Sequence, residues 1–363
     1  MSPKDKQKDL KIRSPQLKLL ERLSNACAVS GDEGEVRAIV LEEVRPHADE
    51  VKVDALGNVL VTRRGKGRDR PRAMLAAHMD EVGFMLVYDD GDGIFRFETV
   101  GGLDERQLVG KPVRVGKDHL PGVIGAKPIH LTKAEERKQA IPIDSLRIDI
   151  GPEAKAKVGD RAAFATRFTR LGPSLRGKAL DDRLGVATLI ELVKNAPSNV
   201  DLLAAFTVQE EVGLRGARVA AYAFDPDLGI AIDSTPAMDL PHWEEENGRP
   251  VENTGYNTRL DAGPAIYVAD GSTLADPRLV RHLIETAEAL EIPYQLRQPG
   301  GGGTDAGAIH LARAGVPSVS VSVPGRYAHT AAGIARLSDW QHTLTLLHGA
   351  LSRLSRKTLA AER

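Results

Sequence analysis

The chain has 363 residues, which is enough for two domains of about 150 residues each, or for one large domain that carries an insertion. Apolar residues make up 42% and charged residues 27%, values typical of globular proteins that exclude the disordered, collagenous and coiled-coil classes. The 49 Lys and Arg residues balance 50 Asp and Glu residues, so the chain carries no general charge that would attract nucleic acid or anionic lipid.

Cysteine content and hydropathy bear on the cellular compartment. Cys27 is the one cysteine, so the chain forms neither an internal disulfide nor a cysteine-rich zinc site, which suits a reducing environment. The polar residues 1–10 lack the apolar core of a signal peptide, and no stretch approaches about 18 consecutive apolar residues. We therefore expect a soluble cytoplasmic protein with neither nucleic acid nor a membrane among its partners.

The first 80 residues predict two helices followed by strands. Apolar side chains recur at helical spacing over residues 15–28 and 33–44. Residues 51–53 and 58–62 have the character of strands, and the apolar run 73–77 is typical of a strand buried on both faces. This opening predicts the start of an α/β layer.

Between residues 82 and 170 the pattern changes to short strands separated by turn clusters, with little helical signal. The strand-like runs are 83–88, 94–99, 112–115 and 122–124. Such a pattern is typical of a small β-rich domain or barrel.

After residue 180, helices again alternate with apolar strands, as in an α/β sheet with crossover helices. The predicted helices are 184–194, 277–290 and 304–314, and the predicted strands are 202–208, 230–233 and 318–323. The sequence therefore predicts a discontinuous α/β domain, residues 15–81 and 171–360, into which a β-barrel of residues 82–170 is inserted.

The candidate site residues follow buried strands, because ligands gather at the carboxyl ends of strands in open α/β sheets. His78 and Asp80 leave the strand at 73–77, and their spacing allows Asp80 to orient the His78 imidazole for metal binding. Glu210 and Glu211 close the strand at 202–208. Two adjacent carboxylates there repel each other and are costly to bury, so a divalent cation would balance them.

Three further strand or helix ends complete the candidate set. Asp181 and Asp182 precede the helix at 184–194, where they also suit helix capping. Asp233 and His329 each follow an apolar strand, where an Asp cap or a satisfied core His is the ordinary alternative. Two imidazoles and three carboxylates suit a pair of zinc, cobalt or manganese ions, and a spare carboxylate suits a general base.

Other chemistries lack their motifs in this sequence. There is no His-Glu-x-x-His helix and no Gly-x-Ser-x-Gly turn. The run Gly300–Gly303 leads into Thr304-Asp305 and not into Gly-Lys-Ser/Thr, so it is not a phosphate-binding loop. It is either a flexible loop capped by the following helix or a substrate loop, with Gly303, Thr304 and Asp305 as the substrate-binding candidates.

Five ordered motifs together resemble the tetrahedral aminopeptidase family, the glutamyl-aminopeptidase and endoglucanase M-like group of two-metal peptidases. The motifs are HMDEVGFM at 78–85, ALDDR at 179–183, QEEVGLRG at 209–216, GGTDAGAIH at 302–310 and VPGRYAH at 323–329. The resemblance runs from about residue 15 to the end of the chain. It implies a zinc-peptidase-like mixed sheet sandwiched by helices and interrupted by a PDZ-like barrel, which supports dimers and a dodecameric tetrahedron.

The resemblance also implies roles for the site residues. One metal ion would be held by His78, Asp181 and Asp233, and the other by Asp181, Glu211 and His329. Asp181 would bridge the two ions and Glu210 would be the general base. Asp80 would orient His78, and Asp182 would support Asp181 through a peptide bond that is often cis in related enzymes.

The implied function is a zinc- or cobalt-dependent aminopeptidase, with manganese also suitable, that removes N-terminal residues from short peptides by means of a water bridging two metal ions. The alternatives are a two-metal deacylase or carboxypeptidase on the same fold, and a non-catalytic peptidase-fold binding protein. The chain departs from the family pattern after Asp233 and after His329, where Thr330 stands in place of the usual Ser-Pro-acidic sequence. Specificities for Glu, Lys and Leu occur within the family, and residues 300–305 and 241–248 are the expected pocket walls.

Overall fold

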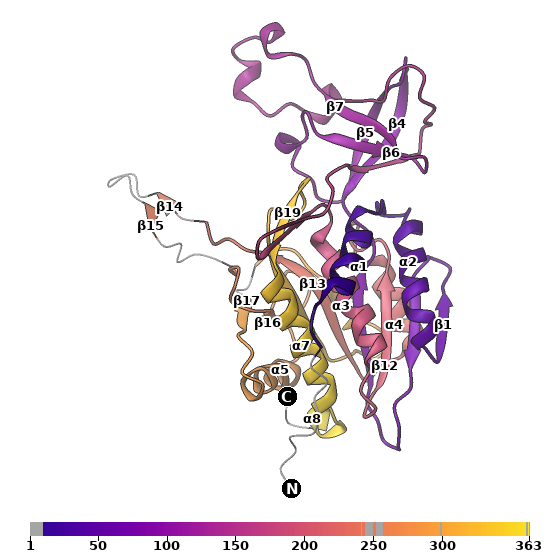
Figure 1. Cartoon of the computed structure of the whole chain (residues 1–363), viewed down its shortest axis with the longest axis vertical. Helices are drawn as coiled ribbons and strands as arrows, with labels where there is room; N and C mark the ends of the chain where they lie inside the picture. The colour runs from indigo at the N-terminus through magenta and orange to yellow at the C-terminus, as the bar shows by residue number, and fades with distance from the viewer. Residues whose placement is uncertain are drawn as a thin grey trace.

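The computed structural model describes residues 10–240, 242–243, 250–251, 257–297, 300–360 and 362. It shows a large α/β layer with a barrel standing at one end of it (Figure 1). Within the described residues, none of the helices is both long and apolar enough to cross a membrane.

An eleven-stranded mixed sheet forms the centre of the α/β layer. In spatial order its main path is β1 (Glu50–Val53), β2 (Val59–Arg63), β12 (Asp201–Thr207), β3 (Arg72–His78), β13 (Leu228–Pro236), β18 (Ser318–Arg326), β19 (Gly333–Arg336), β11 (Ser174–Gly177) and β10 (Thr169–Leu171). β16 (Ala265–Tyr267) pairs with β18, and β17 (Gln295–Arg297) pairs with β16. The four central strands β12, β3, β13 and β18 are parallel, so their carboxyl ends meet at one edge.

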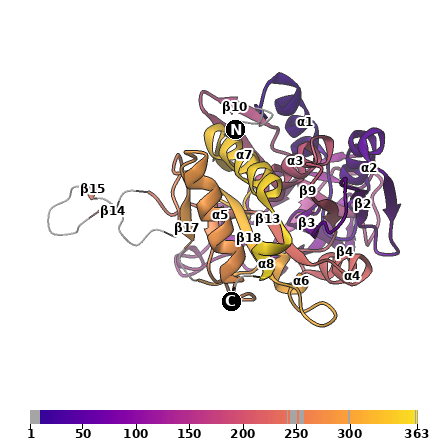
Figure 2. The same ribbon diagram turned by 90° about the horizontal axis from the view of Figure 1, so that it is seen from below.

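Helices cover both faces of this sheet, as the view from below shows (Figure 2). One face carries α1 (Ser14–Asn25), α2 (Gly34–Val44), α3 (Leu180–Lys194), α5 (Pro277–Ala289) and α7 (Leu337–Arg353), and the other carries α4 (Arg215–Phe224) and α6 (Ala306–Ile309). Along β3, Ala73, Leu75 and Ala77 pack on the first face and Met74 and Ala76 on the second. A strand buried on both faces has no polar alternation, which is why 73–77 is a continuous apolar run.

The remaining elements are short. They are α8 (Arg356–Ala360), the pair β14 (His242–Trp243) and β15 (Pro250–Val251), and the 3-10 turns Arg45–His47, Glu105–Gln107, Ile129–Leu131, Glu136–Lys138 and Ile143–Ser145.

The barrel has its own apolar core. Its closed strand order is β4 (Gly83–Gly91), β5 (Ile94–Val100), β8 (Arg147–Asp149), β7 (Leu120–Gly125), β6 (Pro112–Val115) and β9 (Arg161–Phe164). Phe84 stacks edge-on against Phe97 and Phe164, with ring centroids 5.1 and 5.2 Å apart. The predicted fold class, a mixed sheet between helices with an inserted barrel, is confirmed.

One predicted helix was wrong in its extent, and the start of another is kinked. The helix expected over 304–314 is the single turn α6 (Ala306–Ile309), because the chain turns after His310 and continues through Arg313 and Gly315 at φ values of +50° and +99°. The helix expected from residue 184 is assigned from Leu180, although Asp181 and Asp182 have non-helical backbone angles. These two carboxylates therefore lie on a kinked entry to α3 and not on a regular first turn.

A buried ion-pair cluster joins the start of the barrel to the entry of α3. Glu81 precedes β4, and its carboxylate accepts hydrogen bonds from Lys178 Nζ at 2.7 Å and Arg183 Nη2 at 3.1 Å. All three side chains are at most 2% exposed. Lys178 also donates to the Ala26 carbonyl at 2.6 Å. The cluster therefore ties the segment that follows His78 to the entry of α3 and to the chain that follows α1.

Replacing Lys178 by Met is expected to lower the free energy of unfolding by about 3 kcal/mol, because the Glu81 carboxylate loses a partner without access to water. Urea denaturation followed by circular dichroism measures this loss. Lys194→Met is the matched control, since Lys194 also contacts two carboxylates, of Glu43 and Glu191, but its side chain is 20% exposed. The control is expected to cost at most about 1 kcal/mol. Equal losses for the two variants would contradict the account.

Candidate metal centre

The predicted site residues converge at the carboxyl edge of the four parallel strands. β3 ends at His78, which lies in register with Thr207 at the end of β12, and Glu210 and Glu211 follow in the next loop. β13 contributes Asp233. His329 follows β18, and α3 brings Asp181 to the same edge. Parallel strands with their carboxyl ends aligned explain why His78 and His329, 251 positions apart in the sequence, lie at the same edge.

The first group of potential ligands surrounds His78. Its Nε2 atom lies 3.2 Å from Asp181 Oδ1 and 3.7 Å from Asp233 Oδ1. His78 is 2% exposed and Asp233 is 6% exposed, so an ion here would be largely shielded from solvent. His78 also belongs to two sets of three residues whose ligand atoms lie within 4.8 Å of one another, one with Asp181 and Glu211 and one with Asp182 and Asp233.

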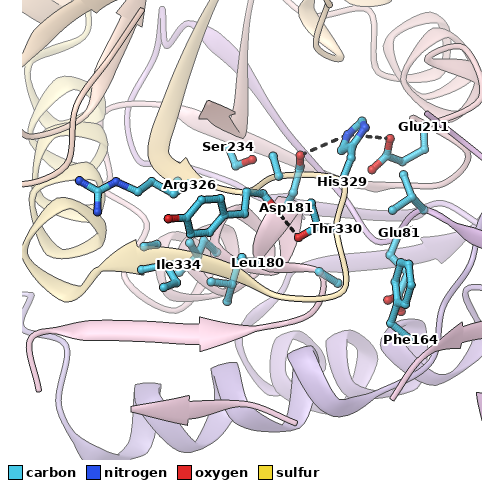
Figure 3. A pocket seen from close by; sticks show the side chains of 18 residues that line it. Glu81, Phe164, Leu180, Asp181, Glu211, Ser234, Arg326, His329, Thr330 and Ile334 are labelled. Atoms are coloured by element: carbon cyan, nitrogen blue, oxygen red, sulfur yellow. Dashed lines mark hydrogen bonds and ion pairs between the residues drawn. The ribbon is translucent and has the colours of Figure 1, made fainter. Parts of the chain in front are cut away.

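The second group surrounds His329, which lies between Asp181 and Glu211 (Figure 3). Its Nε2 atom is 3.2 Å from Glu211 Oε2 and 3.6 Å from Asp181 Oδ2. The two oxygens of Asp181 therefore face different histidines, Oδ1 towards His78 and Oδ2 towards His329. A carboxylate placed in this way is positioned to bridge two ions.

The other nitrogen of each imidazole is held by the protein. His329 Nδ1 lies 2.8 Å from the carbonyl oxygen of Gly102, in the chain that follows β5 of the barrel. His78 Nδ1 lies 3.2 Å from the carbonyl oxygen of Asp80 and 3.6 Å from its carboxylate. Donation of Nδ1–H to these oxygens leaves Nε2 as the free ligand atom of both rings.

The Asp80 carboxylate holds the loop that carries the two glutamates. It accepts hydrogen bonds from the backbone N–H groups of Glu210 at 3.0 Å and Glu211 at 3.2 Å, and from Ser30 Oγ at 2.6 Å. Burial alone would raise the pKa of Asp80, but His78 and these hydrogen bonds outweigh it and the pKa is lowered. The Asp80 carboxylate thus holds the backbone of Glu210 and Glu211, while its backbone carbonyl oxygen is the atom in hydrogen-bond range of His78 Nδ1.

The other carboxylates of the site, those of Glu210, Glu211 and Asp233, are buried close to one another and to Asp181, so their negative charges repel. Burial, reinforced by the neighbouring Asp181, raises the pKa of Glu211 to about 8 and that of Asp233 to about 7. Burial and nearby carboxylates also raise the pKa of Glu210 well above its usual value. Divalent cations would replace the protons held by this cluster, and its imidazole and carboxylate donors fit zinc, cobalt or manganese.

Asp182 follows Asp181, and the peptide bond between these two residues is cis. Its Oδ1 atom accepts the backbone N–H of Gly185 at 2.9 Å, while its buried Oδ2 atom has no hydrogen-bond partner. A Cβ at position 185 would lie 2.3 Å from the Asp182 carboxylate, so a larger residue there would displace this side chain.

A cavity of about 760 Å³ opens beside the metal-ligand cluster. Of the three predicted substrate-binding residues, Gly303 lines this cavity. Thr304 and Asp305 are buried behind it, where the Thr304 and Ser320 hydroxyls lie 2.7 Å apart and Asp305 accepts the Thr207 hydroxyl at 2.5 Å. The other expected wall, residues 241–248, lies outside the described residues apart from the backbone of β14.

Comparison with protein-family models identifies the chain. The model of M42 glutamyl aminopeptidase matches residues 57–346. The chain belongs to the M42 peptidase family. It is accordingly a hydrolase that acts as a peptidase, and M42 peptidases are metallopeptidases.

Individual relatives agree with this assignment. The chain is similar to a putative aminopeptidase of Acetivibrio thermocellus, 36% identical over 92% of this chain and 97% of the relative. It is similar in structure to a TET aminopeptidase of a Thaumarchaeota archaeon, with a TM-score of 0.88 and 35% identity over 96% of this chain and 99% of the other. It also resembles the Pyrococcus horikoshii TET1 peptidase, which can assemble into a tetrahedron or a large octahedral shell, with a TM-score of 0.80 and 33% identity over 93% and 100%.

Several residues around this M42 site were missed by sequence reasoning. Ser30 and Gly102 act through a hydroxyl and a carbonyl that no motif reveals. Arg297 lines the cavity from the end of β17. The only sequence signal for Gly102 is the Gly101–Gly102 pair, where a Cβ on Gly101 would meet Val82 at 2.8 Å and Glu211 at 3.3 Å.

Proposed function

We propose that the protein is a two-metal aminopeptidase that removes N-terminal residues from short peptides. The observation that carries the proposal is Asp181, whose two carboxylate oxygens each face a different histidine. His78, Asp181 and Asp233 would hold one divalent ion, and Asp181, Glu211 and His329 the other. Zinc, cobalt or manganese suits these donors.

The chemistry that the ions would supply when bound is Lewis acidity, which would polarise the scissile carbonyl and lower the pKa of a water molecule. Glu210 lines the same cavity and lies next to the ligand Glu211. Its carboxylate would accept the proton of that water as the water attacks the peptide carbonyl carbon. Glu210 would then return the proton to the leaving amine, so that one residue acts as base and then as acid.

The free α-amino group of the substrate would bind among the carboxylates at the metal end of the cavity. This requirement would restrict cleavage to chain ends. Leucine p-nitroanilide and short peptides are therefore expected to be hydrolysed, whereas their N-acetylated analogues are expected to be resistant by at least about a hundredfold in kcat/KM, since acetylation removes a charged hydrogen-bonding group. The measurement is release of p-nitroaniline and of free amino acids.

The same substrates test the alternatives. A two-metal deacylase would release acetate from the N-acetylated set, which an acetate assay of the same samples detects, and a carboxypeptidase would release the C-terminal residue of a blocked peptide, with Arg297 as the cation for its carboxylate. A non-catalytic binding protein would hydrolyse neither set. Any of these outcomes would contradict the aminopeptidase proposal.

Assembly and location form a further part of the proposal. The barrel segment, residues 82–170, would serve as a dimerisation domain, and dimers would assemble into a tetrahedral dodecamer. The TET1 peptidase of known tetrahedral assembly supports this, as does a TET1 structure described as a dodecamer. The single cysteine, which suits a reducing compartment, supports a cytoplasmic location.

A further inference from the structure

We propose that Cys27, Glu35 and His119 form a further divalent-cation site, of the zinc type, that ties the barrel to the α/β layer. The starting observation is that these side chains each offer one ligand atom, and that the three atoms lie within 4.8 Å of one another. A thiol, a carboxylate and an imidazole are the groups that bind zinc in proteins. The site shares no residue with the metal-ligand cluster at His78, so it is independent of the proposed peptidase function.

The three side chains come from three separate segments. Cys27 follows α1, Glu35 lies in the first turn of α2, and His119 lies in the turn between β6 and β7 of the barrel. Arg161 of β9 reaches the same junction, where its Nε atom donates to the Ser30 carbonyl at 3.3 Å. An ion bound here would therefore join the barrel to the chain around two helices of the α/β layer.

The positions of the donors are largely set by hydrogen bonds. On either side of Cys27, the carbonyl of Ala26 and the N–H of Ala28 are both bonded to the buried ion-pair cluster. The backbone N–H of Cys27 donates to Glu35 Oε2 at 2.9 Å, and the other oxygen, Oε1, lies 2.5 Å from His119 Nε2. Donors held in this way lose little entropy when they bind an ion.

Small movements would convert these contacts into metal ligands. Donor atoms around a tetrahedral zinc ion lie about 3.3–3.8 Å apart, as bond lengths of about 2.0–2.3 Å require. His119 Nε2 and Glu35 Oε1 would separate by about 1 Å to reach this spacing, and their side chains, 32% and 40% exposed, have room to do so. The fourth position would be open to water from a cavity of about 290 Å³ that Cys27 and Glu35 line.

The charges around this cavity bear on which ion it would bind. Its other charged lining residues are Asp32, Arg114, Lys117 and Arg161. The three cationic side chains offset the carboxylates of Asp32 and Glu35, so charge alone would not hold a hard cation such as magnesium. Zinc and cobalt differ from magnesium, because they bind strongly to thiolate sulfur and imidazole nitrogen.

A cysteine beside a histidine is also found in nucleophilic sites, but this thiol is unsuited to that role. Burial raises the pKa of the Cys27 thiol to about 11. A nucleophilic cysteine needs a thiolate at neutral pH, which a lowered pKa provides. The proton of a thiol with a raised pKa stays on the sulfur until a metal ion displaces it.

Cobalt(II) titration of the metal-free, full-length protein tests the proposal, because a thiolate bound to cobalt gives a charge-transfer absorption band in the near ultraviolet. Cys27 is the one cysteine of the chain, so the band reports this site alone even when cobalt also binds at His78. We expect the band to form, to disappear when zinc replaces cobalt, and to withstand a large excess of magnesium.

The discriminating variants keep the cysteine. His119→Gln and Glu35→Gln each remove one of the other two ligands. Each is expected to weaken the cobalt binding that this band reports at least about tenfold, since even residues that only orient a metal ligand are worth that much. The matched control is His130→Gln, which removes an exposed histidine of the barrel segment, in the 3-10 turn Ile129–Leu131, and should keep the wild-type affinity.

Three outcomes would overturn the proposal. The first is the absence of a thiolate band in the wild-type protein. The second is unchanged cobalt affinity in His119→Gln or Glu35→Gln, which would show that the ion does not use that ligand. The third is rapid alkylation of metal-free Cys27 by iodoacetamide at neutral pH that slows in His119→Gln, which would identify a nucleophile. None of these readouts uses peptidase activity, so failure of this proposal and failure of the proposed function are distinguishable.

Discussion

Replacing Glu210 by Gln is expected to lower kcat by about 10²–10⁴-fold while both metal ions stay bound. The amide has nearly the shape of the carboxylate but accepts no proton from water, and Glu210 belongs to neither of the proposed ligand sets. Its backbone N–H, which donates to Asp80, is unchanged by the substitution. Steady-state kinetics on leucine p-nitroanilide and metal analysis of the same sample measure the two quantities together.

The control for this variant is Glu98→Gln, which removes an exposed carboxylate of the barrel strand β5 and is expected to leave kcat unchanged. Near-normal turnover by the Glu210→Gln enzyme would remove Glu210 from the mechanism. A fall in activity that is fully explained by lost metal would show that Glu210 is a ligand and not the base.

Replacing Asp181 by Ala is expected to have a still larger effect, the loss of high-affinity binding of both ions and of all measurable peptidase activity. Asp181 is the one residue shared by the two ligand sets, since its Oδ1 atom faces His78 and its Oδ2 atom faces His329. Removing it therefore weakens both sites at once. Equilibrium dialysis with zinc or cobalt, followed by elemental analysis, measures the number of ions retained.

The companion variant His329→Ala removes a residue that belongs to only one of the two proposed ligand sets, whereas Asp181 belongs to both. His329 contacts Glu211 and Asp181 but belongs to only one ligand set, so this variant is expected to keep the ion at His78 and Asp233. Retention of two tightly bound ions by Asp181→Ala would show that this residue does not bridge them.

Much of the fold was predictable because the apolar pattern of these segments agrees with their place in the sheet or the barrel. The continuous apolar run at 73–77 predicted a strand buried on both faces, and β3 has that environment. After residue 82 the sequence changes to short strand-like runs separated by turn clusters, and this change predicted the barrel. The candidate ligands were predictable for a related reason, since each ends an apolar strand or opens a helix, and these ends meet at one edge of the sheet.

The features that escaped prediction depend on contacts between distant segments. The strands β8 and β9 are no shorter than the predicted runs at 122–124 and 112–115, and they are defined by their pairing with β5 and β7 and with β4 and β6. The helix expected over 304–314 ends after one turn, although its composition suits a longer helix. Arg297 was missed because it reaches the cavity wall through the pairing of β17 with β16, which no local sequence pattern reveals.

The most direct test of the central claim is a crystal structure of the zinc- or cobalt-loaded enzyme with anomalous scattering from the metal. The account predicts two ions about 3.5–4 Å apart, with one oxygen of Asp181 bound to each. His78 and Asp233 would complete one ion's protein ligands, and Glu211 and His329 those of the other. A single ion, or an ion bound by Asp182 in place of Asp181, would contradict it.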